Sequence, residues 1–367
     1  MLNLRRSIVR SSELTAIARS LLVLAVAVAV CAAPAGAQTV GIMPMGDSIT
    51  AGGGYPPGGT FPMDDPTYRY YLYHQLTDSS GPVGWDVDYL GLHSGHRYHA
   101  HQTPNDWSDS PGKHTFLVPD AYRYPGSPPQ PFQDFPDQDM TGSTGYGIGR
   151  HYLAYGASYL RGAMAMDPDM VLVHLGTNDL GGRGGRTLAQ IMASPQTTRN
   201  ELRTLIQIIQ AERAETKVYV ANIIPLGDGA YGYGPGDLPA GDPGEYALVQ
   251  EYNFGNSPAF DAYFGTTTPR QSIADVVADI NANLPGGAPE VVVVDMWTDY
   301  PSRQTGLEHL PDLTHPDYVG DEFMAAQWSG AMVPEPATVT LAAFASLAVL
   351  RLRTARRCRP GHSKRGR

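Results

Sequence analysis

The stretch TVGIMPMGDSIT, residues 39–50, is an apolar run followed at once by a serine between small residues. The run from Thr39 to Met43 predicts a short buried strand, bounded by residues that interrupt regular structure. Ser48 comes just past the end of this strand, so its hydroxyl would stand at the carboxyl edge of a sheet. In open α/β sheets that edge carries the reaction sites. Ser48 is therefore a candidate nucleophile, provided that the rest of the chain supplies its partners.

Strand-like and helix-like segments alternate along the chain on either side of this stretch. The alternation predicts an α/β fold, in which a mostly parallel five-stranded sheet is covered by helices on both faces. The predicted strands are 39–43, 85–92, 170–175, 217–224 and 290–296, and the predicted helices are 67–77, 150–166, one capped by Ser194-Pro195, one opened by Thr268-Pro269 and one from Pro316 to near Gly330.

Two long irregular insertions, 93–140 and 226–267, interrupt this alternation. Loops of this length inside a compact domain are usually functional or mobile. Aromatic residues spaced through the first insertion favour either a cover that binds sugars or a loop folded on its own aromatic side chains. They are Tyr98, Trp107, Phe116, Tyr122, Tyr124 and Phe132.

The first 37 residues are typical of a secretory signal peptide. Four arginines come before an apolar stretch from Leu21 to Ala33, and Ala35-Gly36-Ala37 follows as a small-residue cleavage site. A transmembrane anchor is the alternative, but the apolar stretch is short of the roughly 20 residues that a span needs. We expect cleavage after Ala37 and export through the inner membrane.

The last 35 residues, 333–367, also form a targeting segment. Val333-Pro334-Glu335-Pro336 is followed by an apolar run to Leu350 and then by a cluster of arginines. That order resembles the PEP-CTERM sorting tail, which implies processing by an exosortase in a Gram-negative host that makes exopolysaccharide. A plain tail anchor is the alternative. The hydrolytic domain would then comprise residues 38–332, and its destination would be the periplasm, the cell surface or the medium.

Charge and cysteine content limit the class of partner. The whole chain carries −10, and because residues 1–37 contribute +3 and residues 337–367 contribute +8, the part between them carries −21. So acidic a domain should not bind nucleic acid, and a neutral substrate suits it better than a polyanion. The two cysteines, Cys31 and Cys358, both lie in the targeting ends, so the domain has neither disulfides nor thiolate metal ligands.

The segment Asp312-Leu313-Thr314-His315-Pro316 supplies what a serine nucleophile needs. His315 precedes the last predicted helix and can act as the base, while Asp312 can fold back onto the imidazole and fix its tautomer. The alternative is a surface histidine near a surface aspartate, which is common in proteins.

The oxyanion that forms during acyl transfer needs preorganised donors. The backbone N–H of Ser48 is one candidate, Asn178 at the end of the 170–175 strand can add a side-chain amide, and Gly145 in a tight turn can add another N–H. The alternatives are an ordinary turn residue for Asn178 and a flexible linker for Gly145.

Taken together, GDSIT, GSTGYG, GTND and DLTHP resemble the blocks of the SGNH/GDSL hydrolases, in the same order. Within that superfamily, MPMGDSIT, Tyr68-Arg69, VDYLG and DPDMVLVHLGTND look most like carbohydrate esterase family 3, the acetylxylan-esterase-like branch. The resemblance implies a flavodoxin-like three-layer fold and ester hydrolysis without metal or cofactor. It also implies a triad of Ser48, Asp312 and His315 and an oxyanion hole of Ser48, Gly145 and Asn178. The sequence departs from the family pattern at Thr141 and Ser143-Thr144, where the family has acidic and histidine residues.

Other histidines have weaker claims. His93, His96, His99 and His101 lie in one predicted loop and would suit a metal, but no HExxH pattern supports them. His174, in an apolar strand, is expected to be a hydrogen-bonded core residue. His309 is a rival base that has no acid three residues before it.

These observations predict an exported serine esterase that removes acetyl or other short acyl groups from a polysaccharide. A lipid or aryl esterase on the same triad is one alternative. A non-catalytic polysaccharide-binding matrix protein is another, against which the complete set of Ser, Gly, Asn, Asp and His argues.

Overall fold

The computed structural model describes residues 39–51, 67–78, 84–94, 139–142, 146–154, 157–181, 186–227, 242–266, 270–301, 309–310 and 312–333. All of these residues belong to one compact unit. The predicted signal peptide and residues 334–367 of the predicted sorting tail lie outside them. Within the described ranges, no helix combines the length and the apolar character needed to cross a membrane.

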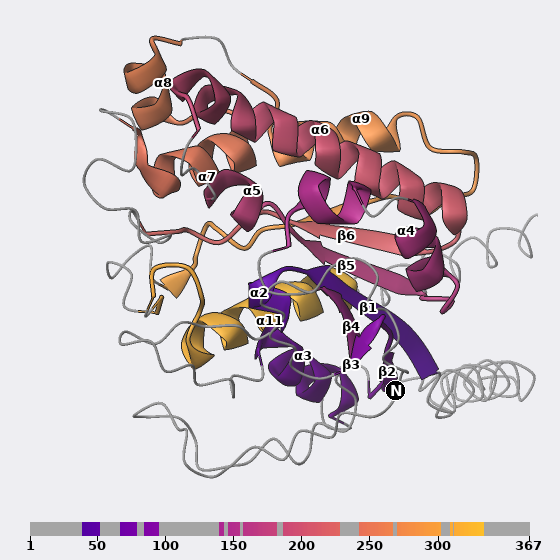
Figure 1. Ribbon diagram of the computed structural model, residues 1–367. Coiled ribbons are helices and arrows are strands. Elements are labelled where there is room, and N and C mark those ends of the chain that lie inside the picture. Colours follow the sequence, from indigo (N-terminus) through magenta and orange to yellow (C-terminus); the bar gives the residue numbers. More distant parts are fainter. Residues whose placement is uncertain are drawn as a thin grey trace, which may run out of the picture. The chain divides into compact units, whose positions relative to one another are not determined.

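The centre of the fold is a sheet of five parallel strands in the order β2-β1-β5-β6-β7 (Figure 1). This is the order of the flavodoxin-like α/β folds, so the predicted fold class is confirmed. The strands are β1 (Thr39–Gly46), β2 (Asp86–Tyr89), β5 (Met170–His174), β6 (Lys217–Ala221) and β7 (Val292–Val294).

Two further short strands, which the sequence did not predict, extend the sheet beside β1. β2 pairs with β1 only as far as Ile42, which leaves the carboxyl end of β1 unpaired on that side. β4 (Asp139–Gly142) takes the open place, with Met45 opposite Thr141, and β3 (His93–Ser94) pairs antiparallel to β4. The strand that carries the nucleophile segment is therefore hydrogen-bonded on both sides up to Gly46.

Helices cover both faces of the sheet, as predicted (Figure 1). On one face α3 (Thr67–Thr77) packs against α11 (Tyr318–Met332). The other face is covered by α4 (Ala157–Met164), α6 (Leu188–Glu212), α7 (Gly244–Phe254) and α9 (Ile273–Asn281). Shorter elements are α2 (Ser48–Ala51), α5 (Thr177–Gly181), α8 (Pro258–Phe264) and the π-helix η2 (Ile148–Leu153).

The core lies between these layers. Because both faces of a parallel sheet are covered, its central strands are apolar on successive residues rather than on alternate ones. Val171, Leu172 and Val173 of β5 are all completely buried, and so are Ile42 and Met43 of β1.

The prediction that Ser194-Pro195 caps a helix was wrong. α6 begins at Leu188, where the Thr187 hydroxyl accepts the N–H of Gln190 in a capping box. Pro195 lies inside this helix and cannot donate to the carbonyl of Ile191. The Ser194 hydroxyl donates to that carbonyl instead, at 2.8 Å, so the backbone acceptor is satisfied and the helix continues.

Other boundaries also differ from prediction. The insertion 226–267 contains α7 and α8, and the predicted helix 150–166 is divided into η2 and α4. α9 starts at Ile273 after a capping box of Ser272 and Asp275, while 267–269, with the predicted Thr268-Pro269 start, lie outside the described residues. Asp317 caps α11, one residue after Pro316, because its carboxylate accepts two backbone N–H groups of the first turn.

Candidate active site

Ser48 is the first residue of α2, directly after the carboxyl end of β1, and it is almost fully buried. The turn that presents it is tight. The Asp47 carboxylate accepts the N–H of Ile49 at 3.0 Å, and a Cβ on Gly46 would overlap the side chain of Thr50. Only glycine therefore fits before the aspartate, because helix α2 folds back over that position.

The structure brings Ser48, His315 and Asp312 into one hydrogen-bonded chain. The Ser48 Oγ lies 2.7 Å from His315 Nε2, and His315 Nδ1 lies 2.6 Å from Asp312 Oδ2. A carboxylate only accepts, so Nδ1 carries the proton and Nε2 is left to accept the serine proton. His315, and not its rival His309, is thus the histidine that contacts Ser48.

Hydrogen bonds within residues 312–315 hold His315 in the position from which it contacts Ser48. Asp312 Oδ1 accepts the backbone N–H groups of Thr314 at 3.0 Å and His315 at 2.7 Å. Leu313 adopts a left-handed conformation with φ of 67°, which costs a non-glycine residue roughly 1–2 kcal/mol. Its N–H donates to Leu310 and its carbonyl accepts from Gly227, so bonds at both sides hold the strained turn.

A second carboxyl group, that of Asp47, directly precedes Ser48 in the chain. Asp47 is completely buried, and burial raises its pKa to about 6, while the Ile49 N–H, the charge of His315 and the Thr177 hydroxyl act in the opposite direction. Asp47 thus braces the turn that presents Ser48, through its bond to the Ile49 N–H.

Asn178 lies in α5, after the strand that neighbours β1, and its side-chain amide donates to the carbonyl of Tyr146 at 2.9 Å. This contact joins the GTND block to the GSTGYG block. An amide nitrogen carries two hydrogens, and the bond to the Tyr146 carbonyl uses one of them. The predicted partner Gly145 lies outside the described residues, as do Ser143 and Thr144, and its assignment stays a prediction.

The next residue, Asp179, supports the same turn. Its carboxylate accepts the N–H of Ile148 at 2.9 Å and is in direct contact with Gly147, where a Cβ would overlap it. Burial raises the pKa of Asp179. Asp179, in the GTND block, thus braces the 146–148 turn of the GSTGYG block.

The remaining histidines take other roles. His309 pairs with Asp317, the cap of α11, at 2.9 Å, so its acid lies eight residues downstream. His174 is buried as expected, but neither of its ring nitrogens has a hydrogen-bond partner within the described structure, so the expected hydrogen bond was wrong. Of the four loop histidines, His93 lies in β3 and the other three lie outside the described residues. In the part of the chain that is described, no group of three or more His, Cys, Asp or Glu side chains could hold a metal ion.

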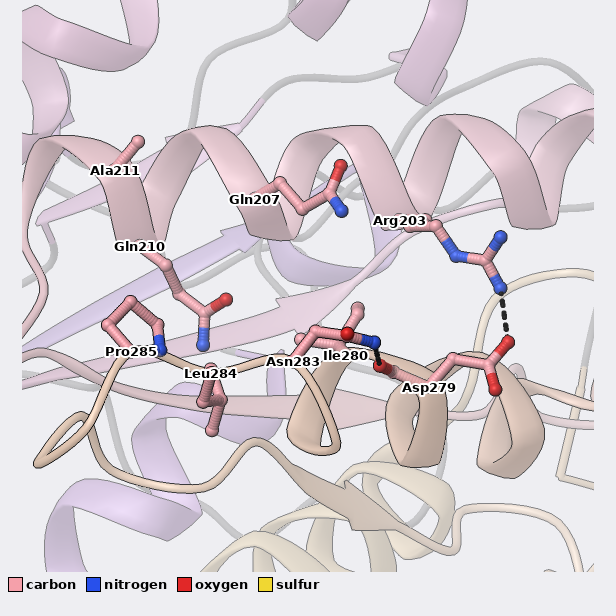
Figure 2. Close-up of a pocket in the computed structure, with 9 residues that line it drawn as sticks. All are labelled: Arg203, Gln207, Gln210, Ala211, Asp279, Ile280, Asn283, Leu284 and Pro285. Carbon is pink, nitrogen blue, oxygen red and sulfur yellow. Dashed lines mark hydrogen bonds and ion pairs between the residues drawn. The ribbon is translucent and has the colours of Figure 1, made fainter.

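A separate groove of about 460 Å³ runs between the carboxyl-terminal half of α6 and α9 with the loop that follows it (Figure 2). An ion pair of Arg203 with Asp279 closes one end. Both helices lead from here into strands that start at the opposite edge of the sheet from Ser48, so this groove is not part of the site described above. Its lining residues are Arg203, Gln207, Gln210, Ala211, Asp279, Ile280, Asn283, Leu284 and Pro285.

The described structure combines a flavodoxin-like sheet with a Ser–His–Asp hydrogen-bonded chain at its carboxyl edge. The family model of the GDSL-like lipases/acylhydrolases matches residues 42–328, and the chain belongs to this family. It is therefore a carboxylic ester hydrolase. No curated protein sequence matches the chain.

Similar solved structures include carbohydrate esterases. The family 3 carbohydrate esterase of Clostridium thermocellum is 20% identical, with a TM-score of 0.41, over 79% of this chain and 94% of that one. The family 3 enzyme of Talaromyces cellulolyticus is 20% identical, with a TM-score of 0.41, over 82% and 97%. Est24, a carbohydrate acetylesterase from Sinorhizobium meliloti, is 15% identical, with a TM-score of 0.39, over 78% and 95%.

Proposed function

We propose that the protein is an exported serine esterase that removes acetyl or other short acyl groups from a polysaccharide. The observation that carries the proposal is the continuous chain from Asp312 through His315 to the Ser48 hydroxyl, with spacings of 2.6 and 2.7 Å. Such a chain is what a serine needs to become nucleophilic at neutral pH, because the base takes the proton as the new bond forms.

In the proposed reaction the Ser48 Oγ attacks the ester carbonyl carbon, and its proton passes to His315 Nε2. The carbonyl oxygen becomes an oxyanion, which the Ser48 N–H, Gly145 and Asn178 stabilise. The C–O bond to the sugar then breaks, and the sugar oxygen takes the proton from His315. Water then attacks the acyl carbon and gives a proton to His315 Nε2, the bond from this carbon to Ser48 Oγ breaks, and Oγ takes the proton from His315 as the carboxylic acid leaves.

The proposed substrate class and the proposed cellular location rest on the sequence. The likeness of MPMGDSIT and VHLGTND to carbohydrate esterase family 3 supports an acylated sugar, and the strongly acidic domain favours a neutral polymer. The signal peptide and the tail after Val333 support export and processing by an exosortase. The final location would be the periplasm, the cell surface or the medium.

Replacing the nucleophile tests the mechanism. We expect Ser48→Ala to lose measurable hydrolysis of p-nitrophenyl acetate while keeping the circular dichroism spectrum and unfolding temperature of the wild type. Ser158→Ala removes the same hydroxyl from an exposed position of α4 and serves as the matched control. Unchanged turnover in Ser48→Ala would remove Ser48 from the mechanism.

The substrate requires a second measurement. Acetate release from a panel of acetylated polysaccharides should exceed the release from simple aryl acetates at equal ester concentration. A preference for p-nitrophenyl esters of long acyl chains would instead favour a lipid esterase. No turnover of any ester, with the polymer still bound, would favour a matrix protein.

A further inference from the structure

The turn 146–148 has a partner for each of three backbone groups, supplied from two directions. From α5, Asn178 donates to the Tyr146 carbonyl and Asp179 accepts the Ile148 N–H, both at 2.9 Å. From η2, the Nδ1 atom of His151 accepts the N–H of Gly147, also at 2.9 Å. The mechanism above uses Asn178 but gives no role to His151.

His151 is held by a stacked ring on one face and by a hydrogen bond at its edge. The Tyr146 ring lies parallel to the imidazole, with centroids 4.7 Å apart and an interplanar angle of 5°. The His151 N–H donates back to the carbonyl of Gly147 at 3.2 Å, so these two residues exchange a pair of hydrogen bonds. An imidazole nitrogen that accepts an N–H carries no proton itself, so the contact specifies the neutral ring.

The helix that carries His151 also supports the nucleophile strand. The Tyr152 hydroxyl lies 2.7 Å from the carbonyls of both Gly46 and Thr141, at the carboxyl ends of β1 and β4. η2 therefore contacts the backbone two residues before Ser48 and the turn that Asn178 contacts. A displacement of the turn relative to Ser48 has to break one of these bonds.

We infer that His151 is a positioning residue of the esterase. It holds the 146–148 turn in place and thereby sets the position of the Asn178 amide that donates to the oxyanion. The inference rests on the proposed function, because it needs Asn178 to stabilise developing charge. His151 touches no reacting atom. It acts through Gly147, whose N–H it accepts, and through Tyr146, whose carbonyl orients the Asn178 amide.

The test is a double-mutant cycle on kcat and KM. His151→Phe keeps a flat ring against Tyr146 but cannot accept the Gly147 N–H, and we expect kcat to fall roughly 10- to 100-fold with KM nearly unchanged. Asn178→Ala should lower kcat by roughly 10²–10³. Because both act on one donor, the double variant should be no slower than Asn178→Ala by more than about threefold. Effects that multiply would overturn the inference.

A second pair of variants separates the hydrogen bond from packing. His151→Asn places an acceptor near the position of Nδ1, whereas His151→Leu has a similar shape without one. We expect the Asn variant to turn over at least about tenfold faster than the Leu variant. Equal rates in two folded variants would overturn the inference, and this pair decides the question if His151→Phe does not fold.

The activity of Ser48→Ala distinguishes a failure of the proposed function from a failure of the His151 inference. An inactive Ser48→Ala enzyme together with wild-type kcat in His151→Phe overturns the role of His151 alone. An active Ser48→Ala enzyme overturns the proposed mechanism and, with it, the positioning role that depends on it.

Discussion

Asp47, directly after β1, and His174, the last residue of β5, are two buried titratable groups near Ser48. Gly46, one residue before Asp47, lies opposite His174 in the register of β1 and β5. Burial raises the pKa of Asp47 to about 6 and lowers the pKa of His174 to about 4. Asp47 is therefore mostly charged at neutral pH. His174 is neutral under the same conditions.

The buried His174 predicts a specific loss of stability in acid. The unfolded chain binds a proton at the ordinary value of 6.5, but the folded protein does so only near pH 4. Between these values the unfolded state binds more protons, so stability falls as the pH falls, by about 1.4 kcal/mol per pH unit from this residue. We expect His174→Leu to lack this contribution, so that its stability relative to the wild type increases from pH 6.5 to pH 4.

Urea unfolding at a series of pH values measures that difference. The comparison isolates His174 because His151, whose pKa is also lowered to about 4 by burial and by Arg150, is present in both proteins. A difference between variant and wild type that stays constant with pH would show that His174 gains a proton in the folded state as readily as in the unfolded one.

At the scale of elements, α6, α7 and the segment before α9 are joined by a buried charge network. The carboxylate of Glu251 in α7 has an exposed fraction of 0% and accepts two bonds from Arg270, at 2.5 and 2.7 Å. Arg199 of α6, also fully buried, lies 3.6 Å from the same carboxylate. Asn253 of α7 accepts the N–H of Ile223 and donates to its carbonyl, just after β6. The network therefore supports the loop that follows a central strand.

We predict that Glu251→Ala lowers the free energy of unfolding by about 3–5 kcal/mol, because it leaves the Arg199 guanidinium buried without its counter-charge. Asp279→Ala is the matched control, since its partner Arg203 is 30% exposed and Asp279 itself 55% exposed. That surface pair should contribute at most about 1 kcal/mol. Chemical denaturation of both variants makes the comparison, and similar losses would show that burial does not decide the strength of these pairs.

Elements with a strong local signal could be predicted from the sequence, and those held by distant partners could not. The strand before Ser48 and the Asp312–His315 turn are each specified within a few neighbouring residues. By contrast, β4 has no alternating pattern and pairs only because β2 stops short along β1. Pro195 is a normal sign of a helix start, but the Ser194 hydroxyl lets the helix continue through it.

The candidate site also has parts that could be predicted and parts that could not. Ser48, Asp312 and His315 were found from motifs, whereas the contact of His151 with Gly147 joins residues that no motif connects. It depends on the π-helical turn, which moves the imidazole over the preceding backbone, and on the packing of η2 against α6. Neither feature has a periodic pattern in the sequence, so neither could be expected from it.

At the scale of the whole molecule, charge is divided between an acidic domain and two basic ends. Residues 38–336 carry −21, while the two ends together carry +11. The described residues reach Val333, the first residue of the VPEP motif, whose N–H donates to the Ser329 carbonyl at the end of α11. The apolar run and the arginine cluster follow in the sequence. A cut on either side of the motif would therefore leave α11 and its contacts with α3 intact.

We predict that the mature protein from its native host lacks both ends, starting after Ala37 and ending near the Val333-Pro334-Glu335-Pro336 motif. Intact-mass measurement should find neither the leader nor the arginine cluster, and the protein should elute from an anion exchanger as a more acidic species than the full chain. Because the cuts fall outside the helices and strands that the structure describes, we expect a protein of residues 38–333 to unfold at the same temperature as the full chain. A mass that retains the tail through Arg367 would favour a plain anchor over a sorting tail. A lower unfolding temperature on truncation would show that the tail packs against the domain.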